Sequence, residues 1–184
     1  MIRIRSFDRT ISEICRAIPL LYNVPMNNSK IISLQDLSPE NIKSMKSRVL
    51  VGGCFDIFHF GHLDFLKKSK QFGETLIIAL ESDEFIRKFK HHEPFHDVQK
   101  RAALLAELEC VDLVVILPLL TSFHEYFEMV QKVQPSVMSL TEGDSQLENK
   151  TKHAQEIGAE IKVVPFIPNI SSTIIHKHAT ITSD

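Results

Sequence analysis

Residues 49–62 read Val-Leu-Val-Gly-Gly-Cys-Phe-Asp-Ile-Phe-His-Phe-Gly-His. The apolar run at 49–51 predicts a buried strand that ends at two glycines. His59 and His62 then bracket Gly61, where an amphipathic segment with helical periodicity begins. Unpaired backbone N–H groups and the helix dipole favour an anion at the start of a helix. The stretch therefore predicts a strand-to-helix junction that can receive a phosphate group.

Apolar runs alternate with amphipathic segments along the rest of the chain, which is typical of an α/β fold with a mainly parallel sheet. This pattern predicts a doubly wound, five-stranded, Rossmann-like sheet whose ligand crevice lies at the carboxyl ends of the strands. Gly73 is expected to end the first of the helices, as a C-terminal glycine. The expected strands are 49–51, 75–80, 113–117, 137–140 and 161–164, and the expected helices are 61–72, 82–89, 98–108, 123–132 and 147–157.

The chain is predicted to hold one domain and an appendage. Residues 31–184 form the domain, and residues 1–30 form an N-terminal appendage in which isoleucines and a leucine at helical spacing predict an amphipathic helix. The two parts together have 184 residues, a length that suits a single hydrophobic core with a small addition.

Composition limits the possible partners and the compartment. Lys and Arg number 21 against 23 Asp and Glu, a net charge of −2, so no basic excess points to nucleic acid. No apolar run is long enough to span a membrane. The three cysteines are odd in number and far apart, which suits a reducing cytoplasm and argues against a disulfide framework.

The spacing of His59 and His62 has three possible explanations. They could be ordinary surface histidines, but their place at a helix start beside Gly61 argues for a ligand. They could bind zinc, which needs three or four ligands, but only Cys54 and Asp56 lie near enough in the sequence to help. No protein-held metal is therefore predicted. Two imidazoles spaced three residues apart can instead donate hydrogen bonds to one phosphate chain and stabilise the charge of a transition state.

The segment Gly53-Cys54-Phe55-Asp56-Ile57-Phe58-His59-Phe60-Gly61-His62 resembles the signature G-x-F-D-x-x-H-x-G-H of the HxGH nucleotidyltransferase superfamily, in its cytidylyltransferase-like branch. The resemblance covers residues 31–178. It implies transfer of a nucleotidyl group from a nucleoside triphosphate to a phosphorylated small molecule, with release of pyrophosphate and with Mg²⁺ accompanying the triphosphate. Similar proteins are often dimers, so a homodimer is one expectation, although the residues do not fix the number of subunits.

The resemblance also implies roles for individual residues. His59 and His62 would hold the triphosphate and stabilise the transition state, with Lys90 as the cation of a mobile loop. Asp56 is expected to contact the acceptor. Whether His91, His92 and His96, in the loop after Lys90, take part is left open. The remaining residues expected to bind the nucleotide are Gly53, Cys54, Phe55, Arg101, Gly143, Asp144, Ser171, Ser172 and Thr173.

Two positions favour one subfamily over another. Phe166 and the segment Glu109-Cys110-Val111-Asp112 are similar to the adenylyltransferase domain of ADP-heptose synthase, which favours ATP and an acceptor such as heptose 1-phosphate. The alternatives are a CTP-dependent enzyme acting on a polyol phosphate such as glycerol 3-phosphate, and a nucleotide-binding module without catalysis.

Overall fold

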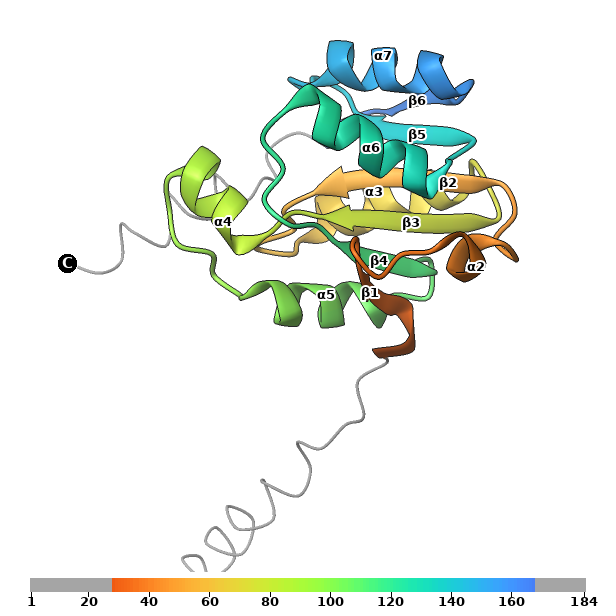
Figure 1. The fold of residues 1–184 in the computed structure, drawn as a ribbon. Coiled ribbons are helices and arrows are strands. Elements are labelled where there is room, and N and C mark those ends of the chain that lie inside the picture. The colour runs from red at the N-terminus through yellow and green to blue at the C-terminus, as the bar shows by residue number, and fades with distance from the viewer. Residues whose placement is uncertain (1–27, 168–184) are drawn as a thin grey trace, which may run out of the picture.

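The computed structural model describes residues 28–167, which form a three-layer α/β structure (Figure 1). Its sheet has six strands in the order β1-β4-β3-β2-β5-β6, and every neighbouring pair is parallel. The predicted doubly wound parallel fold is therefore confirmed, with six strands where five were expected. The strands are β1 (Ile31–Ser33), β2 (Arg48–Gly53), β3 (Thr75–Leu80), β4 (Leu113–Ile116), β5 (Val137–Thr141) and β6 (Glu160–Val164).

The unpredicted strand is β1, which has three residues and pairs with β4 at one edge of the sheet. Residues 28–30 form the 3-10 turn η1 (Asn28–Lys30) that leads into it, and the rest of the predicted appendage lies outside the described residues. Lys30 fixes this turn, because its Nζ donates to the carbonyl oxygens of Val111 at 2.8 Å and Leu108 at 3.3 Å.

Helices follow the strands at nearly the predicted places. The segment expected as one helix at 82–89 is instead a short α-helical turn followed by a π-helical turn, which ends at His91 with φ of 59°. A short helix before β2 was not predicted. The helical elements are α2 (Pro39–Ile42), α3 (Phe60–Lys70), α4 (Asp83–Phe85), η2 (Ile86–Lys90), α5 (Val98–Ala106), α6 (Phe123–Val133) and α7 (Leu147–Ile157).

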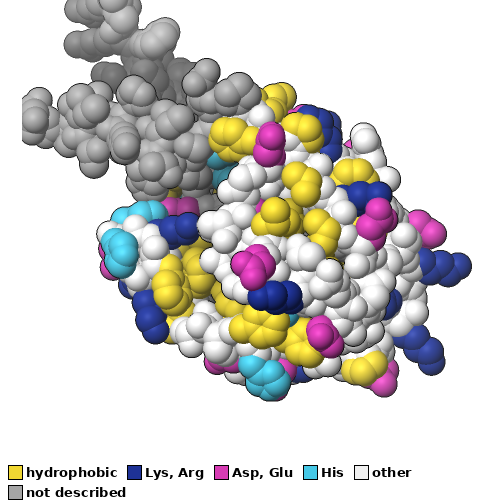
Figure 2. Space-filling view, turned by 90° about the horizontal axis from the view of Figure 1, so that it is seen from above, with side chains coloured by type: hydrophobic (Ala, Val, Ile, Leu, Met, Phe, Trp, Pro, Cys, Tyr) yellow, Lys and Arg dark blue, Asp and Glu magenta, His cyan; other side chains and the backbone are white. Residues whose placement is uncertain are grey.

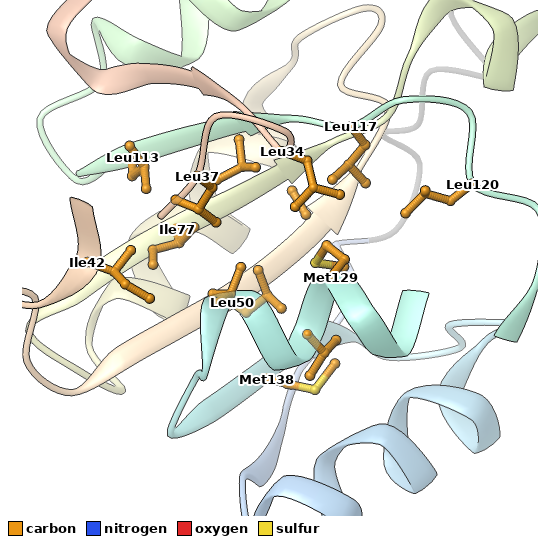
Figure 3. Close-up of a cluster of buried hydrophobic side chains, with 14 of the residues drawn as sticks. Leu34, Leu37, Ile42, Leu50, Ile77, Leu113, Leu117, Leu120, Met129 and Met138 are labelled. Carbon is orange, nitrogen blue, oxygen red and sulfur yellow. The ribbon is translucent and has the colours of Figure 1, made fainter. Parts of the chain in front are cut away.

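Side chains alternate between the two faces of the sheet and form two hydrophobic clusters. Val49, Val51 and Ile78 face α3 and α5, where they meet Leu66 and Leu105. The residues between them point the other way, toward α2, α6 and α7. Figure 3 shows that second cluster, in which the labelled side chains are Leu34, Leu37, Ile42, Leu50, Ile77, Leu113, Leu117, Leu120, Met129 and Met138.

The strand order reverses beside β2. From β2 the chain moves outward to β3 and β4, then returns to the other side of β2 to form β5 and β6. In an open α/β sheet, ligands bind at the carboxyl ends of the strands where the order reverses. The loop that follows β2 lies at this place; it ends at His59, and His62 follows in the first turn of α3.

Gly73 is needed for space rather than for a left-handed conformation. Helix α3 ends earlier, with Gln71 as its C-cap, and Gly73 is not among the described glycines of positive φ. A Cβ at Gly73 would lie 2.2 Å from the carbonyl oxygen of Ser47 and 2.7 Å from Cγ2 of Val49. The turn between α3 and β3 thus passes against the start of β2, where there is no room for a side chain.

Replacement of Gly73 by alanine is therefore expected to lower the free energy of unfolding by about 2 kcal/mol, because backbone must move to admit the methyl group. Urea denaturation followed by circular dichroism measures this change. Gly52→Ala is the matched control, since its Cβ would meet nothing nearer than the oxygen of Ala79 at 3.9 Å. Equal effects of the two substitutions would show that the close approach at Gly73 does not limit stability.

Candidate active site

The two histidines begin helix α3 together. His59 is the N-cap residue, and its Nδ1 accepts a hydrogen bond from the backbone N–H of His62 at 3.4 Å. The rings stack with centroids 3.8 Å apart and planes 16° from parallel. Because Nδ1 of His59 accepts, its neutral ring carries the proton on Nε2, which is left to donate to a ligand.

His62 lies deeper than His59. Its ring packs between Phe55 and Phe58, at centroid distances of 5.0 and 5.7 Å. Burial, reinforced by the neighbouring His59, lowers the pKa of His62 to about 4, and burial also lowers the pKa of His59. Both rings are thus neutral hydrogen-bonding groups at neutral pH. The Nδ1 atom of His62 is buried without a hydrogen-bond partner among the described residues.

The backbone between β2 and α3 is held in a strained shape. Phe55 has a φ of 48°, a left-handed conformation that non-glycine residues rarely adopt. Its ring is buried in the cluster beneath the loop and lies over Gly53, where a Cβ would come within 3.0 Å of it. Gly53 therefore makes room for the Phe55 ring, and the anchored ring keeps the loop in its unusual conformation.

Arg101 supports this loop from below. Its side chain is buried, and its guanidinium donates to the carbonyl oxygens of Cys54 at 2.5 Å and His96 at 3.1 Å, and to Asp83 Oδ1 at 2.7 Å. One residue of α5 thereby ties together the histidine loop, the loop before α5 and the start of α4. It contacts neither cavity described below, and its predicted contact with nucleotide stays a prediction.

Asp56 joins the histidine loop to the loop at residues 91–97. Its Oδ1 accepts from the backbone N–H of Phe95 at 2.7 Å and of His96 at 3.5 Å, and its Oδ2 lies 3.9 Å from Nδ1 of His92. His92 is the one histidine of that loop that also lines the cavity beside the histidine pair. His91 and His96 do not line it.

The cavity beside the histidines has a volume of about 460 Å³ and is formed by the ends of β2 and β5, the start of α3, and η2. Most of the residues predicted to form the site line this one cavity. Phe166 lies in its wall, whereas Cys110 lies apart, packed against the cluster under α5. The predicted site residues that line it are Gly53, Cys54, Phe55, Asp56, His59, His62, Lys90 and Asp144.

Other predicted residues have a different placement. Gly143 has a φ of 78° in an exposed turn and does not line the cavity, although its neighbour Asp144 does. Asp144 accepts from Lys150 Nζ at 2.7 Å and from the backbone N–H of Gln146 at 2.7 Å. Ser171, Ser172 and Thr173 lie outside the described residues.

Cys54 is not poised as a nucleophile. Burial, with a further contribution from Glu81, raises the pKa of the Cys54 thiol to about 11. A thiol in that state is protonated at neutral pH, and the thiolate is the reactive form. Cys54 is therefore not a ready nucleophile at neutral pH.

A second cavity, which the sequence did not suggest, lies on the opposite side of the end of β2. Its volume is about 550 Å³, and it lies against α6 and α7. Glu81, Tyr126 and Lys150 are its notable polar residues. Only Glu81 could have been noticed in the sequence, because a carboxylate directly after the apolar run 75–80 falls at the carboxyl end of the sheet.

The fold and the site define an α/β protein with a histidine pair at a helix start, at the point where the strand order reverses. The chain belongs to the cytidylyltransferase-like family, whose sequence profile matches residues 50–178. The resemblance recognised in the sequence is confirmed by this match.

Relatives in other organisms agree with this membership. The chain is 33% identical over 182 residues to bifunctional protein HldE of Helicobacter hepaticus, covering 94% of this chain and 35% of that protein. It is 37% identical over 130 residues to FAD synthase of Thermococcus kodakarensis, covering 68% of this chain and 84% of that protein. The chain thus spans about a third of the HldE protein and most of the FAD synthase. These relatives support nucleotidyl transfer as the general class of activity.

Solved structures have the same fold. The lipopolysaccharide core biosynthesis protein from Thermoplasma volcanium superposes with a TM-score of 0.54 at 30% identity, covering 66% of this chain and 97% of that one. Pantoate-beta-alanine ligase from Francisella tularensis superposes with a TM-score of 0.59 at 16% identity, covering 82% of this chain and 77% of that one. The second likeness concerns the fold alone.

The described surface has mixed character. In Figure 2, basic and acidic side chains are interspersed over the described part of the face, and histidine, basic and hydrophobic side chains gather at the α4 end. Among residues 28–167, no helix combines the length and apolarity needed to cross a membrane.

Proposed function

We propose that the protein transfers a nucleotidyl group from a nucleoside triphosphate, with ATP preferred, to a phosphorylated sugar such as heptose 1-phosphate. The observation that carries this proposal is the stacked His59–His62 pair at the start of α3, in the wall of a cavity at the switch point of the sheet. Helix N-termini bind phosphate through their free N–H groups, and neutral imidazoles add hydrogen-bond donors.

In the proposed reaction, an oxygen of the acceptor phosphate forms a bond to the α-phosphorus. The bond from that phosphorus to the oxygen bridging to the β-phosphate breaks, and pyrophosphate leaves with the electron pair. His59 and His62 stabilise the charge on the α-phosphate oxygens, and Lys90, an exposed residue that lines both cavities, neutralises charge from the other side.

Magnesium would enter as a complex with the triphosphate, whose oxygens bind Mg²⁺ readily and draw electron density from the phosphorus. Within residues 28–167, no group of three or more His, Cys, Asp or Glu side chains is arranged to hold a metal ion.

The preference for ATP rests on the sequence similarity at Phe166 and Cys110. Phe166 lines the first cavity with Pro165 and Ile167, and so lies where a base could stack. Cys110 lies outside both cavities. Its similarity to the adenylyltransferase domain therefore indicates relatedness and not a contact with the nucleotide.

Pyrophosphate release by the purified protein tests the proposal, with ATP and CTP each supplied with heptose 1-phosphate, glycerol 3-phosphate and other sugar phosphates. Turnover with ATP and a sugar phosphate, at least tenfold faster than with CTP, is the expected result. A CTP preference would overturn the choice of nucleotide. Tight triphosphate binding by calorimetry, without turnover on any acceptor, would instead favour a nucleotide-binding module.

A second candidate is adenylyl transfer to a flavin phosphate. The match to the Thermococcus kodakarensis FAD synthase favours this candidate. The match covers 84% of that protein's length, a larger share than in the HldE proteins. Inclusion of flavin mononucleotide among the acceptors in the same assay distinguishes the two candidates, because each predicts a different product.

A further inference from the structure

The second cavity meets the first at the end of β2. Gly52, Gly53, Cys54 and Lys90 line both cavities. The first cavity lies on the α3 side of the sheet and the second on the side of α6 and α7. A group bound in each would therefore approach the other across the backbone of two glycines, the arrangement that a reaction between two bound substrates needs.

A buried carboxylate in the second cavity lacks a partner on one oxygen. Glu81 follows β3 directly, and its backbone N–H donates to the carbonyl of Gly53 at 3.1 Å. Its side chain is only 8% exposed; Oε1 accepts from the hydroxyl of Tyr126 at 2.9 Å, and Oε2 has no hydrogen-bond partner among the described residues. Buried polar atoms are nearly always paired, so such an oxygen indicates a position for a ligand donor.

Nearby cations do not satisfy this oxygen. Lys150 pairs with Asp144 at 2.7 Å and Arg101 pairs with Asp83 at 2.7 Å, so both are engaged elsewhere. Burial raises the pKa of Glu81 to about 7, and the opposing Coulombic effect of these cations is smaller. A neutral O–H donor on a ligand would complete the hydrogen bonding of Glu81 without adding charge to the cavity.

Aromatic rings border the same space. Phe85 and Phe89 lie with centroids 4.8 Å apart, and both line the second cavity together with Phe123. Phe89 and Phe123 are exposed, large hydrophobic residues. A carboxylate beside aromatic rings suits a sugar, which has hydroxyl groups that donate hydrogen bonds and C–H faces that pack on rings.

We infer that the second cavity binds the sugar of the phosphorylated acceptor and that Glu81 selects it by accepting a hydrogen bond from one of its hydroxyls. The inference rests on the proposed function, since it assigns the acceptor to one part of the same site. The phosphate of the acceptor lies toward Gly53 and Lys90, where it meets the α-phosphate held by the histidines. Tyr126 is a positioning residue, because its hydroxyl fixes Oε1 and leaves Oε2 to the sugar.

Calorimetric titration of heptose 1-phosphate into the protein, with a non-hydrolysable ATP analogue present, tests the inference. Glu81→Leu is expected to weaken sugar phosphate binding by about 10- to 100-fold, because the hydroxyl loses its buried carboxyl partner. Glu81→Gln, which keeps an acceptor oxygen, is expected to restore part of the loss. The affinity for the ATP analogue is expected to stay within twofold in both variants. Glu148→Leu, at an exposed carboxylate of α7 outside both cavities, is the matched control.

The outcomes separate the two proposals. If the wild-type protein binds heptose 1-phosphate in a Glu81-dependent manner but shows no turnover, the proposed function fails and the inference stands. Unchanged sugar phosphate binding by Glu81→Leu, with unchanged binding of the ATP analogue, would overturn the inference. Absence of sugar phosphate binding by the wild-type protein, or binding of flavin mononucleotide alone, would also overturn it.

Discussion

Alanine in place of His59 is expected to reduce kcat/KM for nucleotidyl transfer by about 100-fold or more, the usual cost of losing one donor to a transition-state oxygen. The substitution removes the Nε2 donor and also the Nδ1 acceptor that caps the first turn of α3. Steady-state pyrophosphate release under saturating acceptor measures the change. The loss is expected mainly in kcat, because the donor acts on charge that develops at the α-phosphate.

The matched control for this experiment is His124→Ala. His124 lies on α6, its side chain is 78% exposed, and it lines neither cavity. Its replacement is expected to leave kcat/KM within twofold of the wild-type value. Full turnover by His59→Ala would contradict the assignment of the histidine pair to catalysis. Lys90 would then be the next candidate for stabilising the transition state.

Replacement of Arg101 by methionine is expected to lower the free energy of unfolding by about 3 kcal/mol, because a buried partner of Asp83 is lost. The same change leaves the carbonyl oxygens of Cys54 and His96 without their donor. Methionine keeps much of the length of the side chain, so the effect reports on the guanidinium rather than on a cavity. Urea denaturation at neutral pH measures it.

Arg87→Met supplies the comparison for Arg101. Arg87 forms an exposed pair with Glu93 at 2.9 Å, and water and salt screen exposed pairs, so its replacement is expected to change the free energy of unfolding much less. Equal destabilisation by the two variants would contradict the role of Arg101 as a buried anchor. Triphosphate affinity of Arg101→Met, measured at a temperature where the variant is folded, then tests whether the anchored loop is needed for binding.

The fold was largely predictable because its signals are local. Helix α7 begins and ends at the predicted residues, and β3 matches its predicted range of 75–80, in which all six residues are buried. Strand β1 was missed because three half-buried residues carry too little periodicity to separate them from a loop. The π-helical turn at 86–90 was missed because a periodic apolar pattern does not show whether backbone hydrogen bonds join residues four or five positions apart.

The candidate site was predictable where it is contiguous in sequence. The loop from Gly53 to His62 forms one wall of the first cavity, as its residue types suggested. Arg101 was harder to interpret, because an arginine on a helix is usually a surface charge and only the fold shows it buried. Glu81 and Tyr126 are 45 residues apart, and no local pattern relates a strand end to a helix that packs beside it.

Part of the wall between the two cavities is the end of β2, in which Gly52 and Gly53 contribute backbone and no side chain. A nucleotide sugar formed there would extend over this wall, with its nucleoside on one face of the sheet and its sugar on the other. A stable compound that joins the two halves would engage both cavities as one ligand, and the link between them would raise its affinity over either half by about 10²- to 10⁴-fold. On the proposed function, the shared wall at Gly52 and Gly53 would therefore also make the protein a target for a single bridging inhibitor.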